Sequence, residues 1–394
     1  MSFWATLPQP ILGLAPMDGV TDAAFRRVVA SQGRPDITFT EFTNVNEICR
    51  GPDHLLESLI YSEAERPIVA QLYGKDPDQF YRAAQVVCEL GVDGLDINMG
   101  WPSESVTASR SGAALIKTPD LAHAIVRAAR QGLEDWAGGQ SIHSQGFKPS
   151  RIEFIHTLNH NRSGMPVVSR RLLPLSIKTR LGFDCVVVER WVEHLLAARP
   201  AAITLHGRTL QQMYRGAADW SAIAEAAKLA YGTGTLMLGN GDLNTLVDAI
   251  RRAAESKVQG VLVGRGTLGS PWFFREKEQA RRAFSERDDL STLPATAWEP
   301  PVSVSHRMQV MLDHARQYEA IAGLERFRSI RKHLGWYCKG FPHAAAMRGK
   351  MFGASNVQDV ERIVAEFCQE LMQAERDASA PTPLAAQPSS VSAA

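Results

Sequence analysis

The stretch Gly91-Val-Asp-Gly-Leu-Asp-Ile-Asn-Met-Gly-Trp-Pro-Ser-Glu-Ser-Val106 decides how the fold of this chain is interpreted. Residues 94–97 form an apolar run typical of a buried strand, and the polar loop after it begins at Asn98. An apolar strand ending in Asn-Met-Gly fits a site at the carboxyl end of a barrel strand. It fits an ordinary strand-to-helix turn with an asparagine cap equally well. The rest of the chain has to decide between the two.

The composition is that of a globular protein with a large core. Of the 394 residues, 45% are hydrophobic and 22% charged, and the net charge is +1. So small a net charge argues against a surface that is basic throughout, and any nucleic-acid site has to be a local patch. The five cysteines are widely spaced without a C-x-x-C pair, which favours a reducing cytoplasm over a disulfide framework or a zinc site. We expect no metal, and we expect no membrane segment because no apolar run approaches 18 residues.

Apolar runs alternate with helical patterns along the first three quarters of the chain. The runs that predict strands are 11–14, 37–40, 67–74, 94–97, 175–179, 202–205, 236–238 and 260–263. A helical stretch follows each of them, including stretches around 52–61 and 273–284. This rhythm predicts an α/β fold, a (β/α)8 TIM barrel over residues 1–284.

Three further segments interrupt or follow the barrel. Residues 135–173 lack periodicity and predict a mobile insertion, and positions 138–174 hold five Lys or Arg against one Glu. That charge suits contact with RNA phosphates, and it also suits a merely solvated loop. Residues 285–301 are a linker, 302–375 an all-helical domain, and 376–394 a tail whose Ala, Pro and Ser content predicts disorder.

Polar side chains follow the predicted strands at the point where each strand ends. Because the carboxyl ends of barrel strands meet at one mouth, we expect these side chains to converge there. They are Pro16, Met17, Glu41, Gln71, Asn98, Lys178, Arg180, His206, Arg208, Asn240 and Arg265. Cys, His and carboxylates at metal-ligand spacing are absent from this set, and the chain has no G-x-S-x-G motif.

Two glycine-rich loops suggest a phosphate site. Gly264-Arg-Gly-Thr-Leu-Gly269 satisfies G-x-G-x-x-G, but a Rossmann fold also needs an acidic residue after a second strand, about 20 residues on. Only Asp288 and Asp289 lie there, within the polar linker, so that interpretation fails. In a barrel, the loops after strands seven and eight bind phosphate, and here they hold Asn240-Gly-Asp242 and Gly264-Arg265. Two tight turns would explain the glycines as well.

A lysine, a histidine and a glutamine facing such a cradle suit a flavin. A cation near the ring stabilises the negative charge that the flavin gains on reduction, and Lys178 is the candidate for that cation. The alternative for a lone lysine at a strand end is an ordinary salt bridge.

Eight motifs, in order from Ile11 to Phe367, together resemble those of the tRNA-dihydrouridine synthases. The motifs are Leu14-Ala-Pro-Met-Asp-Gly-Val-Thr-Asp22, Gln71-Leu-Tyr-Gly74, Asp96-Ile-Asn-Met-Gly100, Lys178-Thr-Arg180, Leu205-His-Gly-Arg-Thr209, Gly239-Asn-Gly-Asp242, Val263-Gly-Arg-Gly266 and Arg331-Lys-His-Leu-Gly-Trp-Tyr-Cys-Lys-Gly-Phe-Pro342. The last of these is the most specific to the family.

The resemblance implies an FMN-bound barrel with a helical domain that recruits tRNA. Reduced flavin, recharged by NADPH, would deliver hydride to the C5=C6 bond of specific uridines. By motif, the FMN-binding residues would be Ala15, Pro16, Met17, Gln71, Lys178, His206, Asn240, Gly241, Asp242, Gly264 and Arg265. Asn98 would contact the target uracil, and Arg180, Arg208, Tyr214 and Arg215 would lie toward the RNA. We expect a cytoplasmic monomer.

The helical domain supports an RNA partner by its composition. From residue 326 to 350 there are seven Lys or Arg and no acidic residue. Arg328, Arg331 and Lys332 fall on one helical face, and aromatic residues are interleaved with the basic ones. A solvated face over an aromatic core explains the same pattern.

The chain departs from the family at one sequence position that takes part in the reaction. The family has a cysteine directly after Asn-Met-Gly, which donates a proton opposite the hydride, whereas this chain has Trp101. An indole N–H is far less acidic than a thiol, so Trp101 cannot take over that role. Another acid, such as Ser103, Glu104, Cys49 or water, would then serve. Alternatively, the protein binds tRNA without reducing it, or it reduces a small pyrimidine or enone.

Overall fold

The computed structural model describes residues 2–102, 111–286, 293–299 and 301–379. Within these residues, eight parallel strands form one sheet in the order β1-β8-β7-β6-β5-β4-β3-β2. The strands are β1 (Ile11–Leu14), β2 (Thr38–Asn44), β3 (Ile68–Tyr73), β4 (Gly94–Met99), β5 (Leu175–Arg180), β6 (Ala202–His206), β7 (Leu236–Asn240) and β8 (Gly260–Val263). A bridge between Gly13 and Ile37 links β1 to the start of β2. The predicted (β/α)8 barrel is confirmed.

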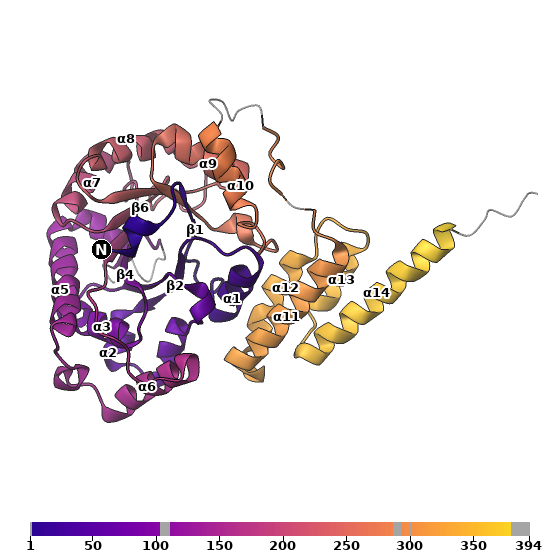
Figure 1. Cartoon of the computed structure of the whole chain (residues 1–394), viewed down its shortest axis with the longest axis horizontal. Coiled ribbons are helices and arrows are strands. Elements are labelled where there is room, and N and C mark those ends of the chain that lie inside the picture. The colour runs from indigo at the N-terminus through magenta and orange to yellow at the C-terminus, as the bar shows by residue number, and fades with distance from the viewer. Residues whose placement is uncertain (1, 103–110, 287–292, 300, 380–394) are drawn as a thin grey trace, which may run out of the picture. The chain divides into compact units, whose positions relative to one another are not determined.

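Helices surround the sheet, as Figure 1 shows. They are α1 (Ala23–Gln32), α2 (Val45–Arg50), α3 (Pro77–Glu89), α5 (Pro119–Ala137), α7 (Val188–Ala197), α8 (Trp220–Ala230), α9 (Leu246–Ser256) and α10 (Lys277–Glu286). Side-chain caps start several of them: Asp22 accepts a hydrogen bond from the amide of Phe25, and Asp219 accepts one from Ala222. The stretch expected to be helical around 52–61 is a 3-10 segment, Asp53–Leu59, because α2 already follows β2 directly.

Strand β2 is longer than its apolar run predicts and contains an irregularity. Its register against β3 shifts between Phe39 and Phe42. The hydroxyl of Thr40 donates to the carbonyl of Glu41 and accepts from the amide of Gln71 at this point. Bulges of this kind re-aim side chains at the rims of barrels. Here the shift pairs Phe42 with Gln71.

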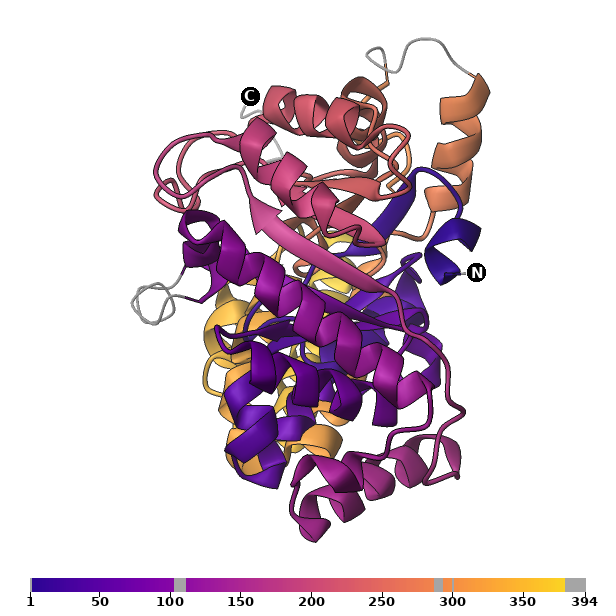
Figure 2. The same ribbon diagram turned by 90° about the vertical axis from the view of Figure 1, so that its left-hand side faces the viewer.

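The segment between α5 and β5 contains a helix where the sequence indicated a loop. Helix α6 (Pro149–Ser163) lies at the outside of the barrel (Figures 1 and 2). Its Arg151 donates to Asp53 at 2.8 Å and to the carbonyls of Ile48 and Gly51 at the end of α2. Asn159, fully buried, donates to the carbonyl of Glu89 at 2.8 Å. These contacts hold α6 against the barrel, in contrast to the mobile loop that we expected.

The chain divides into two compact units, residues 1–303 and 304–394. The second unit contains α11 (Val304–Ala322), a 3-10 segment (Leu324–Ile330), α12 (Arg331–Tyr337), α13 (Ala344–Met351) and α14 (Val357–Ser379). Helix α14 therefore continues to residue 379, past the expected start of the disordered tail at 376, and residues 380–394 lie outside the described part. In the described part, no helix is both long enough and apolar enough to span a membrane.

Two buried histidines occupy the core of this second unit. His314 and His333 are 0% and 1% exposed, and their ring centroids lie 4.9 Å apart. The His314 Nδ1 lies 3.1 Å from the hydroxyl of Tyr337. Burial lowers the pKa of His314 to about 3. Burial, with His314 and Lys332 adding to it, lowers the pKa of His333 well below its usual value.

The second unit is expected to lose stability in mild acid for this reason. Both rings are neutral when folded, so the unfolded chain binds more protons below pH 6.5. The free energy of unfolding should fall as the pH drops from about 6.5 toward 3, by about 1.4 kcal/mol per pH unit for each histidine. Hydrogen exchange of α11 and α12 at pH 7 and pH 5 measures this loss. His314→Gln should weaken the pH dependence, and an unchanged dependence would contradict the assignment.

Candidate active site

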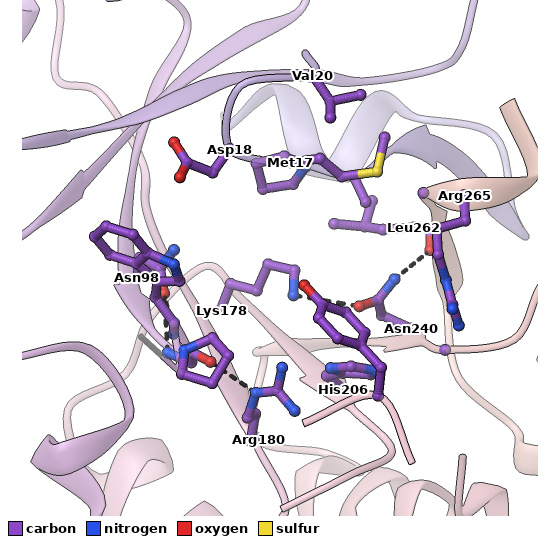
Figure 3. Close-up of a pocket in the computed structure, with 18 of the residues that line it drawn as sticks. Met17, Asp18, Val20, Asn98, Lys178, Arg180, His206, Asn240, Leu262 and Arg265 are labelled. Atoms are coloured by element: carbon purple, nitrogen blue, oxygen red, sulfur yellow. Dashed lines mark hydrogen bonds between the residues drawn. The ribbon is translucent and has the colours of Figure 1, made fainter. Parts of the chain in front are cut away.

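One cavity of about 280 Å³ lies at the carboxyl ends of the strands (Figure 3). Its lining comes from β2 to β8 and from the loops after β1, β4, β6, β7 and β8. The residues are Ala15, Pro16, Met17, Asp18, Val20, Phe42, Gln71, Asn98, Gly100, Trp101, Pro102, Lys178, Arg180, His206, Tyr214, Asn240, Gly241, Asp242, Leu243, Asn244, Leu262, Gly264 and Arg265. Every residue predicted to bind the cofactor is among them, as are Asn98, Trp101, Arg180 and Tyr214.

A hydrogen-bonded row of polar side chains crosses three neighbouring strands below the cavity. Strand register places Gln71, Asp96 and Ser176 side by side on β3, β4 and β5. Asp96 accepts from Gln71 Nε2 and from the Ser176 hydroxyl, both at 2.6 Å, and burial raises its pKa to about 6. Gln71 Oε1 in turn accepts from Asn98 Nδ2 at 3.0 Å. The row fixes the side chains of Gln71 and Asn98 at the cavity wall.

Lys178 is a cation held in the cavity wall, and it is partly buried. It pairs with Asn98 in the strand register, and its Nζ donates to Asn240 Oδ1 at 3.2 Å. Asn240 Nδ2 donates to the carbonyl of Leu262 at 2.7 Å, which fixes the orientation of the amide. Burial, with the nearby Arg180 adding to it, lowers the pKa of Lys178 to about 8. The ammonium form therefore prevails at neutral pH, although Nζ forms no ion pair with a carboxylate in the described part of the chain.

Arg180 holds two cavity loops together. Its Nε donates to the carbonyl of Gly100 at 2.7 Å, and its Nη1 donates to the carbonyls of Thr209 and Met213 at 3.0 and 3.1 Å. These bonds tie the loop after β4 to the loop after β6. Burial lowers the pKa of Arg180 to about 10, and at neutral pH the guanidinium still carries its charge.

Asp242 binds two arginines at the side of the cavity formed by the loops after β7 and β8. It accepts from Arg208 at 2.7 and 2.8 Å, from Arg265 at 3.0 Å and from the amide of Ala218 at 2.7 Å. Arg208 also lies 3.4 Å from His206 Nε2, which has to be the acceptor because arginine only donates. Burial and the surrounding Arg180, Lys178, Arg208 and Arg265 lower the pKa of His206 well below its usual value, so the ring is neutral.

Trp101 belongs to an aromatic cluster at the edge of the cavity. Its ring centroid lies 4.5 Å from that of Phe42 and 4.9 Å from that of Tyr73. Asn98 Oδ1 accepts from the amides of Gly100 and Trp101, both at 2.9 Å. Asn98 is therefore a cap for this loop as well as a cavity residue.

Several sequence predictions are corrected by these positions. Arg208 is 2% exposed, because it turns toward Asp242 and toward the carbonyls of Arg215 and Gly216. Arg215 is exposed outside the cavity lining, and its place toward the RNA stays a prediction. Glu41 lies within β2 and does not line the cavity, although the sequence predicted that it would. Phe42 lines the cavity instead, because the register of β2 shifts between Phe39 and Phe42.

Of the substitutes considered for the missing thiol, Cys49 is not brought to the cavity. The Cys49 thiol lies 3.5 Å from the carbonyl of Gln79 on α3, away from the lining residues, and burial raises its pKa to about 11. Ser103 and Glu104 lie outside the described residues.

The basic residues of the second unit lie on either side of a change in helix type. Arg328 is exposed in the 3-10 segment, whereas Arg331 and Lys332 begin α12. Arg331 donates to the carbonyl of Ala354 at 2.6 Å, so it joins α12 to the loop between α13 and α14. Whether these residues meet RNA stays a prediction.

Sequence reasoning missed part of the lining: Asp18, Val20, Phe42, Gly100, Pro102, Leu243, Asn244 and Leu262. Asp18 and Val20 share a loop with Met17, and Leu243 and Asn244 directly follow Asp242, so their neighbours could have indicated them. Leu262 carries no such signal, because an apolar residue within a strand is most often core. Among the described residues, no group of three or more His, Cys, Asp or Glu could hold a metal ion.

Comparison with known proteins identifies the family of this chain. The family model described as "Dihydrouridine synthase (Dus)" matches residues 13–135 and 165–376, leaving out residues 136–164, where α6 lies. A probable tRNA-dihydrouridine synthase 2 of Bacillus subtilis (strain 168) is 32% identical over 371 residues, covering 93% of this chain and 96% of that protein. A probable tRNA-dihydrouridine synthase of Staphylococcus aureus (strain COL) is 29% identical over 93% of this chain and 95% of its own. An old yellow enzyme homologue from Zymomonas mobilis aligns with a TM-score of 0.38 and 12% identity, covering 75% of this chain and 94% of that one. This chain belongs to the dihydrouridine synthase family of enzymes.

Proposed function

We propose that the protein is an FMN- and NADPH-dependent enzyme that reduces specific uridines of tRNA to 5,6-dihydrouridine. The observation that carries the proposal is the cavity itself. A lysine, a neutral histidine and a glutamine line it together with two glycine loops and an arginine, in a chain of the dihydrouridine synthase family. Because tRNA is the substrate, we place the enzyme in the cytoplasm. We expect it to act as a monomer, with residues 302–375 as its tRNA-binding domain.

The cavity residues fit a flavin mononucleotide. Gly241 and Gly264 leave backbone exposed at the cavity, and a Cβ on Gly264 would lie 3.2 Å from the Met17 sulfur. Arg265 has a side chain that is 56% exposed, so it can meet a phosphate in addition to Asp242. Gln71, Lys178 and His206 line the rest of the wall and would hold the ring system. When bound, FMN reduced by NADPH supplies the hydride that uracil takes up.

The protein's own residues supply charge, orientation and a dry environment. The Lys178 ammonium stabilises negative charge in the cavity, where burial strengthens its effect. The neutral His206 and the amides of Gln71 and Asn98 orient polar edges by hydrogen bonds. Asn98 Nδ2 carries two N–H groups, one of which donates to Gln71, and the other suits a uracil carbonyl.

Reduction of a C=C bond also requires one proton, and residue 101 cannot provide it as an acid. In the described part of the cavity lining, five residues carry groups that can hold or relay a proton: Asp18, Lys178, His206, Tyr214 and Asp242. Substitution of each in turn would identify the group. If the protein binds tRNA and flavin but forms no dihydrouridine, the alternative of a tRNA-binding homologue without turnover, which Trp101 favours, is correct.

The direct test combines spectra with tRNA analysis. Purified protein should be yellow, and NADPH should bleach it. In cells that lack the gene, one or more tRNA positions should lose dihydrouridine and regain it when the wild-type gene is restored. Restoration only by Trp101→Cys would show that the natural protein has lost turnover. A yellow protein without affinity for tRNA would instead favour a small-molecule pyrimidine or enone reductase.

Gly241→Ala is expected to abolish stable flavin binding. Gly241 has φ +131°, and a Cβ there would lie 2.7 Å from the Ala218 Cβ and 3.2 Å from His206 Cδ2, so the loop has to move. We expect affinity for FMN to fall at least about tenfold, measured by fluorescence titration of the deflavinated protein. Gly232→Ala is the matched control, with φ +76° and nothing within 4 Å of its Cβ. Equal affinities in the two variants would contradict the cradle.

A further inference from the structure

The ring of Trp101 is held in a defined place at the rim of the cavity. Its backbone amide donates to Asn98 Oδ1 at 2.9 Å, and its carbonyl accepts from the amide of Ala113 at 3.3 Å. The preceding Gly100 carbonyl accepts from Arg180 Nε at 2.7 Å. The backbone of Gly100 and Trp101 is thus fixed by hydrogen bonds from β4, β5 and the segment that leads into α5.

Two further aromatic side chains support the ring from neighbouring strands. Phe42 packs against it with 53° between the ring planes, and Tyr73 packs edge-on at 83°. Phe42 and Tyr73 contact one another edge-on as well, at 5.7 Å. Three rings from β2, β3 and the β4 loop therefore form one rigid cluster, which we call the Trp101 cluster. The register shift in β2 is what brings Phe42 into it.

The Trp101 cluster is not part of the closed core. All three side chains are partly exposed, and Phe42 and Trp101 both line the cavity that Asn98, Lys178 and Arg180 also line. An apolar π surface beside amide and cationic groups suits a flat base that needs one stacked face and one hydrogen-bonded edge. Proteins commonly bind single, unstacked bases in this manner.

We propose that Trp101, supported by Phe42 and Tyr73, is the stacking surface for the target uracil, which gives this chain a base-binding residue where its family has an acid. The inference rests on the proposed function. An extruded pyrimidine would lie against the indole, with its polar edge toward Asn98. The indole is larger than the family's cysteine side chain. It does not donate the proton but increases affinity for an unpaired base, and the proton comes from another group.

The test compares stacking with simple space filling. Trp101→Phe keeps an aromatic face, and Trp101→Leu keeps apolar volume without one. Each variant is titrated with two synthetic tRNAs, one with the target uridine mapped by the test above and one abasic at that position. Because base–aromatic stacking is commonly worth a tenfold or larger change in affinity, wild type and Trp101→Phe should bind the uridine tRNA about tenfold more tightly than the abasic one. Trp101→Leu should distinguish the two less than about threefold.

Controls separate failure of this inference from failure of the proposed function. Tyr231→Leu removes an aromatic ring that is 88% exposed at the end of α8, and it should behave as wild type. The flavin content of each variant reports whether the cavity is intact. If Trp101→Leu discriminates between the two tRNAs as strongly as wild type does, the stacking role is wrong while the proposed function stands. If wild type binds neither tRNA, the proposed function fails first.

Discussion

Replacing Lys178 with methionine is expected to lower kcat for dihydrouridine formation by about a hundredfold to a thousandfold, the usual cost of losing one preorganised charge-stabilising donor. The side chain is partly buried, and its Nζ is placed by Asn240 at 3.2 Å. Methionine keeps the length and volume of the chain, so flavin binding should survive. The reduction potential of the bound flavin should become more negative by about 60 to 90 mV, the same free energy expressed for two electrons.

Lys178→Arg is the matched control because it keeps the charge. Burial lowers the pKa of Lys178 to about 8, so its favourable charge is present below that pH and is lost as the pH rises through it. Wild-type activity should therefore decline on the alkaline side. Lys178→Arg should be less active but free of that decline, because arginine stays protonated. An unchanged potential in Lys178→Met would show that Lys178 is only a structural residue.

Replacing Glu65 with leucine is expected to destabilise the barrel by about 3 to 5 kcal/mol, the cost of leaving one charge of a buried pair without its partner. Arg26 and Glu65 are both 0% exposed at their side chains and meet at 2.7 Å. Arg26 also donates to the carbonyl of Thr21 at 2.7 Å, and the Thr21 hydroxyl accepts from the amide of Met17 at 2.9 Å. The loop that carries Met17 should loosen, and flavin affinity should fall with stability.

The double variant Arg26→Met/Glu65→Leu tests the reason for this loss. Removing both charges avoids an unpaired buried ion, so much of the stability should return. Urea unfolding of the barrel, followed by hydrogen exchange of α1 and β3, measures both variants. If the double variant is as unstable as Glu65→Leu, lost packing explains the effect and the unpaired charge does not.

The strand ends and the cavity residues on them were predictable from the sequence. Apolar runs of four to eight residues determine barrel strands, and all parallel strands present their carboxyl ends at one mouth. A polar residue at the end of a regular strand, such as Lys178 or Asn240, therefore reaches the cavity. The glycine loops after β7 and β8 follow the same rule. The amino-acid sequence alone was therefore enough to predict these loops and strand-end residues.

Side chains that can turn toward a partner were not predictable in this way. Arg208 follows its strand as Arg180 does, yet it turns to Asp242, a carboxylate 34 residues further on. Arg331 has the spacing of an RNA-facing residue, yet it binds a backbone carbonyl across a loop. A long flexible side chain takes the partner that the tertiary structure places within reach, and the local sequence does not specify that partner.

The Trp101 cluster shows both contributions at one site. The sequence by itself determined that an indole replaces the family's thiol after Asn-Met-Gly, and therefore that residue 101 is no acid. Only the tertiary structure decided what the indole does instead. Phe42 and Tyr73 come from β2 and β3 and Trp101 from the loop after β4, and a one-residue shift in β2 brings Phe42 to the cavity. Side chains alternate between the two faces of a strand, so such a shift exchanges which residue faces the site, and apolar periodicity does not reveal it.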